Sequence, residues 1–75
     1  LNPRDADAFN KWGAALMGLG KYSESIEKYE IATKLNPQDV DAFNNWGIAL
    51  VGLGKYSEAI EKFETATKLN PNYSK

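Results

Sequence analysis

The chain has 75 residues and a net charge of −1, from nine Lys and Arg against ten Asp and Glu. That balance lacks the basic face expected of a small nucleic-acid-binding domain, and no apolar run approaches the ~20 residues that span a bilayer. There is no Cys and no His. Disulfides, zinc-finger sites, thiolate nucleophiles and His general bases are therefore excluded. We expect no metal, cofactor, nucleic acid or membrane as a partner.

The chain resembles itself after a shift of 34 positions. The tripeptide Leu-Asn-Pro begins at Leu1, Leu35 and Leu69. Between the 34-residue blocks that begin at Leu1 and Leu35, eight positions differ and 26 agree. Such agreement indicates one supersecondary unit used repeatedly. We expect a single segment over 1–75, with repeat 1 over about 5–37, repeat 2 over about 39–71, and 72–75 beginning a further unit.

The first part of each unit has the pattern of a helix. A proline breaks the chain, and Asp5 or Asp39 follows as an N-cap whose carboxylate accepts from free helical N–H groups. Apolar residues then recur on one side, which predicts helices over about 6–18 and 40–52. A Gly-Leu-Gly sequence ends each helix, because glycine adopts open or left-handed conformations. In the first helix the apolar stripe is Ala8, Phe9, Trp12, Ala15, Leu16 and Leu19.

The second part of each unit predicts a second helix. Ser23 and Ser57 are the expected N-caps, and the helices run over about 23–35 and 57–69. Each ends before the next proline, which disfavours helical geometry in the preceding residue. Glu24 and Lys28 have the i,i+4 spacing of a solvated ion pair, as do Glu30 and Lys34. The apolar face consists of Tyr22, Ile26, Tyr29 and Ala32, and in the second unit of Tyr56, Ile60, Phe63 and Ala66.

A fixed set of aromatic, small and proline positions recurs in both units. They are Phe9, Trp12, Gly13, Leu16, Gly20, Tyr22, Ser25, Tyr29, Ala32 and Pro37, and then Phe43, Trp46, Gly47, Leu50, Gly54, Tyr56, Ala59, Phe63, Ala66 and Pro71. This pattern resembles the tetratricopeptide repeat, which also has a period of 34. The chain departs from the family at Trp12 and Trp46, where Leu is usual, and at Phe9 and Phe43, where Trp is frequent. Gly13 and Gly47 are expected to let the two helices of a unit approach closely.

The resemblance implies an all-α fold. It is an α-solenoid of antiparallel helix–turn–helix pairs with right-handed superhelical stacking, in which the first helices line a concave groove. Arrays of this family bind extended peptides or partner helices and scaffold assemblies. The implied function is therefore a non-catalytic protein–protein interaction module, with a protein or peptide as its partner.

If the apolar stripe of each first helix is buried, the opposite face of that helix lines the groove. Three of the eight differences between the units fall on that face, at Lys11/Asn45, Ala14/Ile48 and Met17/Val51. Such divergence is expected if the groove recognises a ligand, and equally if an exposed surface has relaxed packing constraints. The expected groove residues are Asp7, Asn10, Lys11, Ala14, Met17, Asp41, Asn44, Asn45, Ile48 and Val51. A carboxylate clamp of the kind some family members use is not expected, because Asn10 and Ala14 stand where it needs Lys and Asn.

The alternative function is architectural: a self-associating repeat fragment with no ligand of its own. Solenoid ends usually need a polar capping helix for solubility, and none is visible in the sequence. We therefore expect self-association through the ends or marginal stability of the monomer. A recent natural duplication and a consensus-style design predict the same fold. The expected end residues are Ala8, Trp12, Phe63, Ala66, Thr67 and Leu69.

Overall fold

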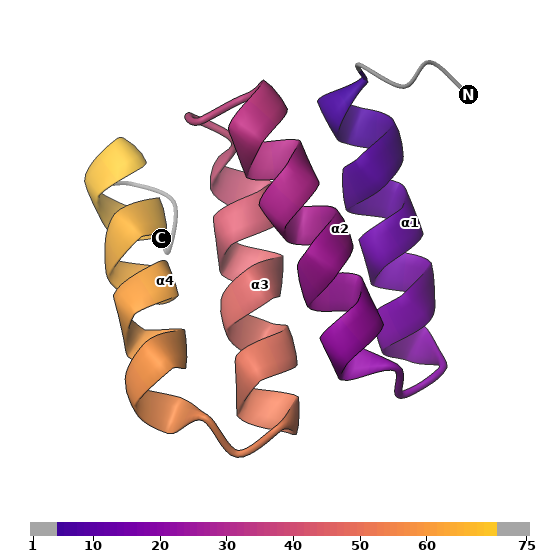
Figure 1. The fold of residues 1–75 in the computed structure, drawn as a ribbon. Coiled ribbons are helices and arrows are strands. Elements are labelled where there is room, and N and C mark those ends of the chain that lie inside the picture. The colour runs from indigo at the N-terminus through magenta and orange to yellow at the C-terminus, as the bar shows by residue number, and fades with distance from the viewer. Residues whose placement is uncertain (1–4, 71–75) are drawn as a thin grey trace.

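The computed structural model describes residues 5–70 and contains four helices in antiparallel pairs (Figure 1). The sequence-based helix bounds are confirmed to within one residue. The described part measures 31 × 25 × 19 Å along its principal axes. Within it, no helix is long and apolar enough to cross a membrane. The tripeptide at residues 1–3, Pro71 and the expected further unit at 72–75 lie outside the described residues. The helices are α1 (Ala6–Gly18), α2 (Tyr22–Leu35), α3 (Val40–Gly52) and α4 (Tyr56–Leu69).

Aspartate side chains cap the first helix of each repeat, as the sequence predicts. The Asp5 carboxylate accepts from the N–H groups of Asp7 at 3.0 Å and Ala8 at 3.4 Å. The Asp39 carboxylate accepts from the Ala42 N–H at 3.1 Å. Each carboxylate thus pairs helical N–H groups that have no partner within the helix.

The predicted serine caps are wrong. α2 begins at Tyr22 and α4 at Tyr56, so Ser23 and Ser57 lie inside the first turn. The N-cap positions belong to Lys21 and Lys55, whose side chains make no capping hydrogen bond. The reason lies in the tightness of the preceding turn, which brings the chain into the second helix earlier than the serine pattern suggested.

That turn depends on one glycine in each repeat. Gly20 has φ +79° and Gly54 has φ +78°, a left-handed conformation that side chains disfavour. The Lys21 N–H then donates back to the Leu16 carbonyl at 2.9 Å. The equivalent bond in the second repeat joins Lys55 to Leu50 at 2.8 Å. The two turns therefore have the same conformation and are closed by the same hydrogen bond.

Glycine also sets the spacing within each pair. A Cβ atom on Gly13 would lie 2.7 Å from Cε1 of Tyr29, and one on Gly47 would lie 2.5 Å from Cε1 of Phe63. Both distances are shorter than real Cβ contacts allow. The expectation that Gly13 and Gly47 permit close approach is confirmed, and the aromatic ring of the second helix lies directly on the glycine.

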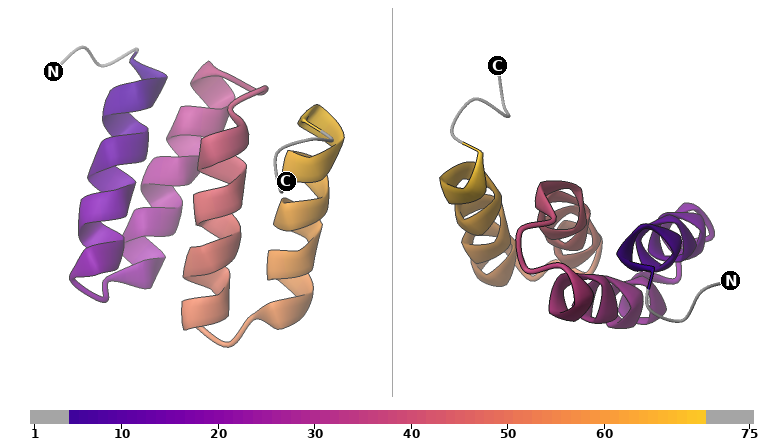
Figure 2. Two further views of the ribbon diagram at one scale, coloured as in Figure 1. Left: turned by 180° about the vertical axis from the view of Figure 1, so that it is seen from behind. Right: turned by 90° about the horizontal axis from the view of Figure 1, so that it is seen from above.

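The core lies at the junction between the two repeats. Tyr29, Ala32, Ala42 and Ala49 are fully buried and form one cluster. α2 lies in front of α3 in Figure 1, and Figure 2 shows the same pair from behind and from above. The side chains packed against this cluster are Phe9, Met17, Tyr22, Ile26 and Trp46. Burial is therefore greatest where α2 meets α3.

Three residues of the predicted apolar stripe on α1 are exposed rather than buried: Trp12, at 45%, Ala15 and Leu19. Ala15 is exposed, whereas its equivalent Ala49 is fully buried. The difference arises because α2 covers Ala49, while no described helix covers the corresponding side of α1. Leu19 is 71% exposed because it caps the end of α1 and lies in the turn. Its prediction as a core residue is wrong.

Candidate interaction surfaces

The expected groove residues lie on α1 and α3, which are in contact with each other. We call these ten residues the groove stripe. Ile48 and Val51 are 44% and 41% exposed, and Asn44 and Asn45 are half-buried. Two members lie deeper than predicted, since Met17 packs against the core cluster and Asn10 is buried. The exposed members are Asp7, Lys11, Ala14, Asp41, Ile48 and Val51.

Asn10 has a structural role rather than an open binding position. Its Oδ1 accepts from Nδ2 of Asn45 at 3.4 Å, and only 9% of the residue is exposed. The expectation that Asn10 lies open on the groove face is wrong, because it is buried where α1 meets α3. The contact joins α1 to α3 and brings the two halves of the groove stripe side by side.

The Lys11/Asn45 difference between the repeats follows from this contact. Asn45 reaches back across the repeat junction to Asn10, whereas Lys11 pairs with Asp7 of its own helix at 3.1 Å. The side chains of Lys11 and Asp7 are 79% and 69% exposed, so the pair contributes little net stability. The groove stripe therefore has an ion pair on α1, and on α3 it combines Asp41, two amides and the apolar Ile48 and Val51.

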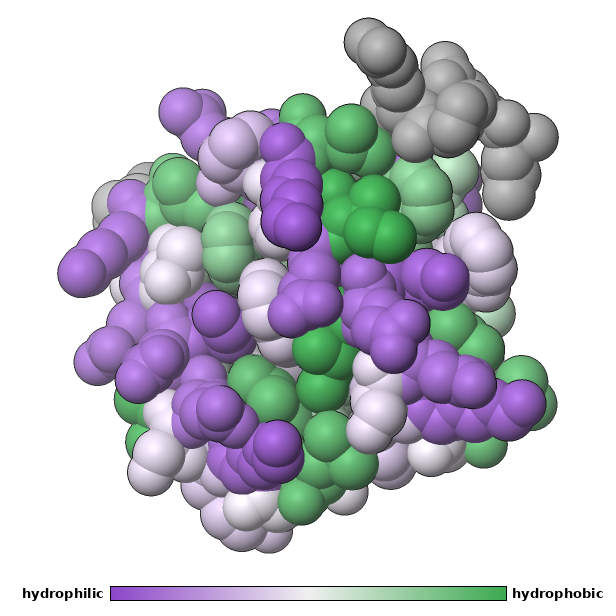
Figure 3. All heavy atoms as spheres, in the orientation of Figure 1, coloured by the Kyte–Doolittle hydropathy of each residue, from purple (hydrophilic) through white to green (hydrophobic). Residues whose placement is uncertain are grey.

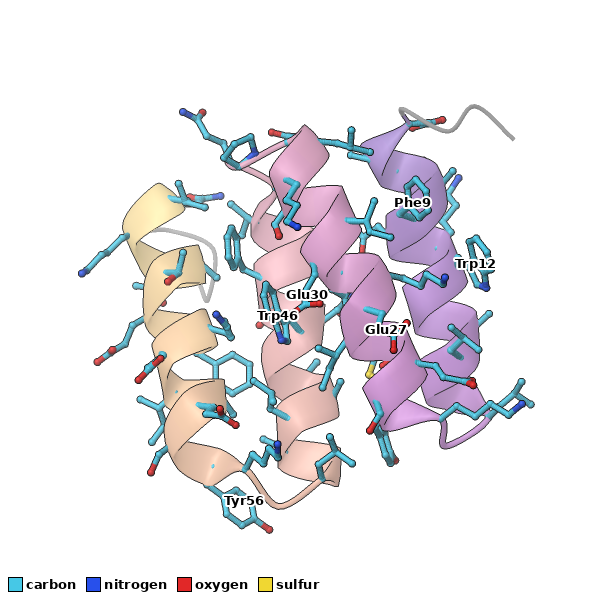
Figure 4. All side chains as sticks on the ribbon, in the orientation of Figure 1. Phe9, Trp12, Glu27, Glu30, Trp46 and Tyr56 are labelled. Carbon is cyan, nitrogen blue, oxygen red and sulfur yellow. The ribbon has the colours of Figure 1, made fainter. Side chains whose placement is uncertain are left out.

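A hollow of about 260 Å³ lies on the side of the molecule opposite the groove stripe, between α2 and α4. Trp46 forms part of it, with its ring stacked on Phe43 at 6.1 Å between centroids and Nζ of Lys62 3.9 Å above it. Figure 4 shows Trp46 in the space between the ribbons of α2 and α4, and Figure 3 shows this side with small apolar groups among hydrophilic residues. The lining residues are Ile26, Glu30, Trp46, Leu50, Lys55, Glu58, Glu61 and Lys62.

Sequence reasoning missed this hollow because two repeats are needed to build it. The sequence did contain a signal for the contact at Trp46, because a Lys follows each Trp at the same spacing in both repeats. Lys28 Nζ lies 3.9 Å from the centroid of the Trp12 ring, as Lys62 does at Trp46. Lys28 thus packs on an aromatic face, which is a favourable cation–π arrangement. The predicted ion pairs of Glu24 with Lys28 and of Glu30 with Lys34 are wrong, since the ion pairs among the described residues are Lys11–Asp7 and Lys55–Glu58. Among the described residues, no cluster of carboxylates has the arrangement of a metal site.

The model of the tetratricopeptide repeat matches residues 10–74, which is most of the chain. The chain belongs to the tetratricopeptide-repeat family. Solved structures agree: "MamA MSR-1 C2" is similar with a TM-score of 0.90 and 26% identity, over 96% of this chain and 41% of that one. "Crystal structure of MamA protein" has a TM-score of 0.88 and 30% identity, over 99% of this chain and 40% of that one.

A further MamA crystal structure has a TM-score of 0.89 and 30% identity, over 99% of this chain and 43% of that one. The present chain thus spans less than half the length of these structures. No curated protein matches it in sequence. The fold is the all-α solenoid of antiparallel pairs that the sequence indicated. Tetratricopeptide repeats generally mediate protein–protein interaction and are typically non-catalytic.

The outer faces of the tetratricopeptide pair form a third surface. Trp12 on α1 is 45% exposed, and Tyr56 on α4 is 63% exposed. In Figure 4 both rings point away from the body of the molecule. On α4 a hollow of about 400 Å³ is lined by Ile60, Phe63, Glu64, Thr67 and Lys68.

Most of the expected end residues lie on these outer helices with some exposure. Thr67 is exposed, Leu69 is 37% exposed, and Ala8 and Phe63 are half-buried. Ala66 is an exception. It is only 3% exposed, because the helices of its own repeat already cover it. The expectation that Ala66 lies uncovered is wrong.

Proposed function

We propose that the chain is a protein-binding module that holds an extended peptide or a partner helix against the groove stripe of α1 and α3. The observation that carries this proposal is the pair Ile48 and Val51, which are apolar and 44% and 41% exposed. They are three residues apart on α3, so their side chains are neighbours on one helix face. Half-buried Asn44 and Asn45 on the same helix offer amide donors and acceptors.

The composition of this stripe suits a peptide better than a small molecule. A peptide presents apolar side chains for the shelf formed by Ile48 and Val51, and backbone groups for Asn44. The charged pair Asp7–Lys11 at the α1 edge resembles the polar rim that surrounds the apolar part of protein interfaces. The same stripe lacks the Cys, His and metal-type clusters that a catalytic site would use.

The test is selection from a random peptide library, followed by measurement of the dissociation constant of the selected peptides. The double variant Ile48→Ala, Val51→Ala removes the apolar shelf, and position 48 then matches Ala14 of the first repeat. We expect at least tenfold weaker binding, since each half-exposed side chain contributes roughly 1 kcal/mol when covered. The matched control is Leu35→Ala, an apolar and 39% exposed residue at the end of α2, outside the groove stripe. Equal binding by the groove variant and the control would refute the groove as the site.

A second candidate function is self-association through the outer faces of α1 and α4. The exposure of Trp12 and Tyr56, at 45% and 63%, favours it. Single exposed apolar residues are ordinary on protein surfaces, whereas Tyr56 and Ile60 lie four residues apart on one face of α4 and are both exposed, as in a docking surface. Light scattering over a concentration series tests this proposal, with rising mean mass as the expected result. A constant monomer mass at high concentration would contradict it.

A further inference from the structure

The junction between the two repeats shows how one helix pair of this chain binds the next. The Tyr22 ring of α2 lies on Gly52 at the end of α3, where a Cβ atom would be 2.7 Å from the Tyr22 Cε1 atom. Ala42 and Ala49 of α3 are fully buried, and Ile26 of α2 packs against the same cluster. We call this arrangement the repeat joint: tyrosine and isoleucine from a second helix, and glycine and two alanines from the next first helix.

Each outer face of the chain carries one half of a repeat joint. The α4 half consists of Tyr56 and Ile60, which are 63% and 56% exposed and correspond to Tyr22 and Ile26. The α1 half consists of Ala8, Ala15 and Gly18, which correspond to Ala42, Ala49 and Gly52. All five residues are identical in type to their counterparts in the formed joint.

The α1 half is open at the place where the tyrosine ring would lie. A Cβ atom on Gly18 would have no heavy atom within 4 Å, in contrast to the crowding at Gly52. The α4 half has an apolar hollow of about 400 Å³ beside Ile60, Phe63 and Thr67. The α1 face therefore has a glycine, Gly18, on which no ring lies, and the α4 face has an exposed ring, Tyr56, of the kind that lies on Gly52 in the formed joint.

We propose that this chain associates head to tail, with α4 of one copy packed on α1 of the next in the register of the repeat joint. Tyr56 of one copy then lies on Gly18 of the next, and the apolar hollow of α4 is covered. This proposal rests on the self-association proposed above and specifies its geometry. A net charge of only −1 per copy opposes such contact weakly. In a longer array the same two faces would receive neighbouring repeats.

Pairing of like faces does not reproduce the joint. Two α4 faces bring tyrosine against tyrosine without a glycine, and two α1 faces bring glycine against glycine without a ring. The head-to-tail contact uses two different surfaces, so each added copy presents a fresh surface of each kind. Open-ended chains whose length grows with concentration are therefore expected, rather than a closed dimer.

The experiment uses two variants that each block one face. Gly18→Ala places a methyl group where the formed joint has no room for one, while the isolated copy has space for it. Tyr56→Ala removes the ring from the other face, where it is 63% exposed and contributes little to the fold of its own copy. The control is Ser23→Ala, because Ser23 and its equivalent Ser57 are both exposed and hence lie outside the joint. Circular dichroism verifies that helix content is unchanged in each variant.

Sedimentation velocity over a concentration series gives the readout. The parent chain and Ser23→Ala are expected to show a mean mass that rises without a plateau. Each blocking variant alone should need at least tenfold higher concentration to reach the same mean mass. An equimolar mixture of Gly18→Ala and Tyr56→Ala should associate and stop at two copies, since each supplies the face that the other has lost.

Failure of the two proposals is distinguishable. A parent chain that stays monomeric overturns self-association and the head-to-tail geometry together. A parent that associates while Gly18→Ala and Tyr56→Ala associate equally well overturns the head-to-tail register alone. A mixture that grows beyond two copies, or that does not associate, also overturns it.

Discussion

Substitution of Gly13 by alanine tests whether ring-on-glycine packing sets the distance between α1 and α2. The new Cβ atom would lie 2.7, 2.8 and 3.1 Å from three atoms of the Tyr29 ring. Tyr29 is 0% exposed and belongs to the core cluster, so its ring has no open space into which it can move. Overpacking of this kind costs about 1–3 kcal/mol, while alanine in place of glycine within a helix returns about 1 kcal/mol.

The expected net loss for Gly13→Ala is therefore up to about 2 kcal/mol in the free energy of unfolding. Gly18→Ala is the matched control, because it makes the same chemical change in the same helix where no atom lies within 4 Å. It should leave the stability unchanged or raise it by less than about 1 kcal/mol, since the position is at the helix end. A difference of about 2 kcal/mol corresponds to roughly 8–16 °C in Tm for a domain of this size.

Urea and thermal unfolding followed by circular dichroism measure this difference. The protein concentration is kept low enough for the parent chain to be monomeric, so that association does not contribute to Tm. If Gly13→Ala is as stable as Gly18→Ala, the ring of Tyr29 does not constrain the approach of the helices.

Four further predictions concern buried or capping polar groups. Tyr29→Phe should raise the free energy of unfolding by about 1 kcal/mol in chemical denaturation, because the buried Tyr29 hydroxyl has no partner among the described residues. The second repeat already has Phe63 at the equivalent position. A variant less stable than the parent would contradict the prediction. Burial also raises the pKa of Tyr29 above 10.0. The ionisation of Tyr29 therefore leaves the free energy of unfolding unchanged below about pH 10 and lowers it above that pH. In urea titrations at alkaline pH, the parent should lose stability more steeply than Tyr29→Phe. Asp39→Ala should cost about 1 kcal/mol through loss of the cap, and Ser23→Ala close to nothing, by thermal unfolding. Asn45→Ala should cost about 1–3 kcal/mol by leaving the buried Asn10 amide unpaired, and a neutral result would mean that water replaces the bond.

The helices and turns of this chain could be predicted from local sequence because their causes are local. The aspartate caps hydrogen-bond within three residues, at Asp5 and Asp39, and the left-handed turn depends on the single glycine at 20 or 54. The prediction of the serine caps was wrong because the cap position depends on the turn before the helix, which the local cap pattern does not include. Ser23 fits the local pattern of a cap, but the turn closed by the bond from Lys21 to Leu16 places the N-cap at Lys21, two residues before Ser23.

Burial was harder to predict because identical residues have different neighbours in the two repeats. Ala15 and Ala49 occupy equivalent positions, yet one is exposed and the other fully buried. Asn10 reads as a groove residue from its helix face, and only the approach of Asn45 from the next repeat buries it. The hollow at Trp46 likewise needs residues from both repeats. A single-unit pattern carries no information about which units are present on either side.

The positions at which the repeats agree and differ separate the two proposed surfaces. Every residue named for the repeat joint is the same in both units, including the pairs Tyr22/Tyr56 and Gly18/Gly52. The exposed groove stripe differs instead, at Lys11/Asn45 and Ala14/Ile48. Stacking requires the two halves of a joint to fit each other at every step, whereas a groove position need only suit its ligand. The joint and the groove therefore use different residues, and they meet at Gly18, which lies one helical turn from Ala14 of the groove stripe. Head-to-tail assembly would place successive grooves next to each other. A peptide that spans two copies would then bind more tightly than its contacts with one copy allow, because the second contact is intramolecular.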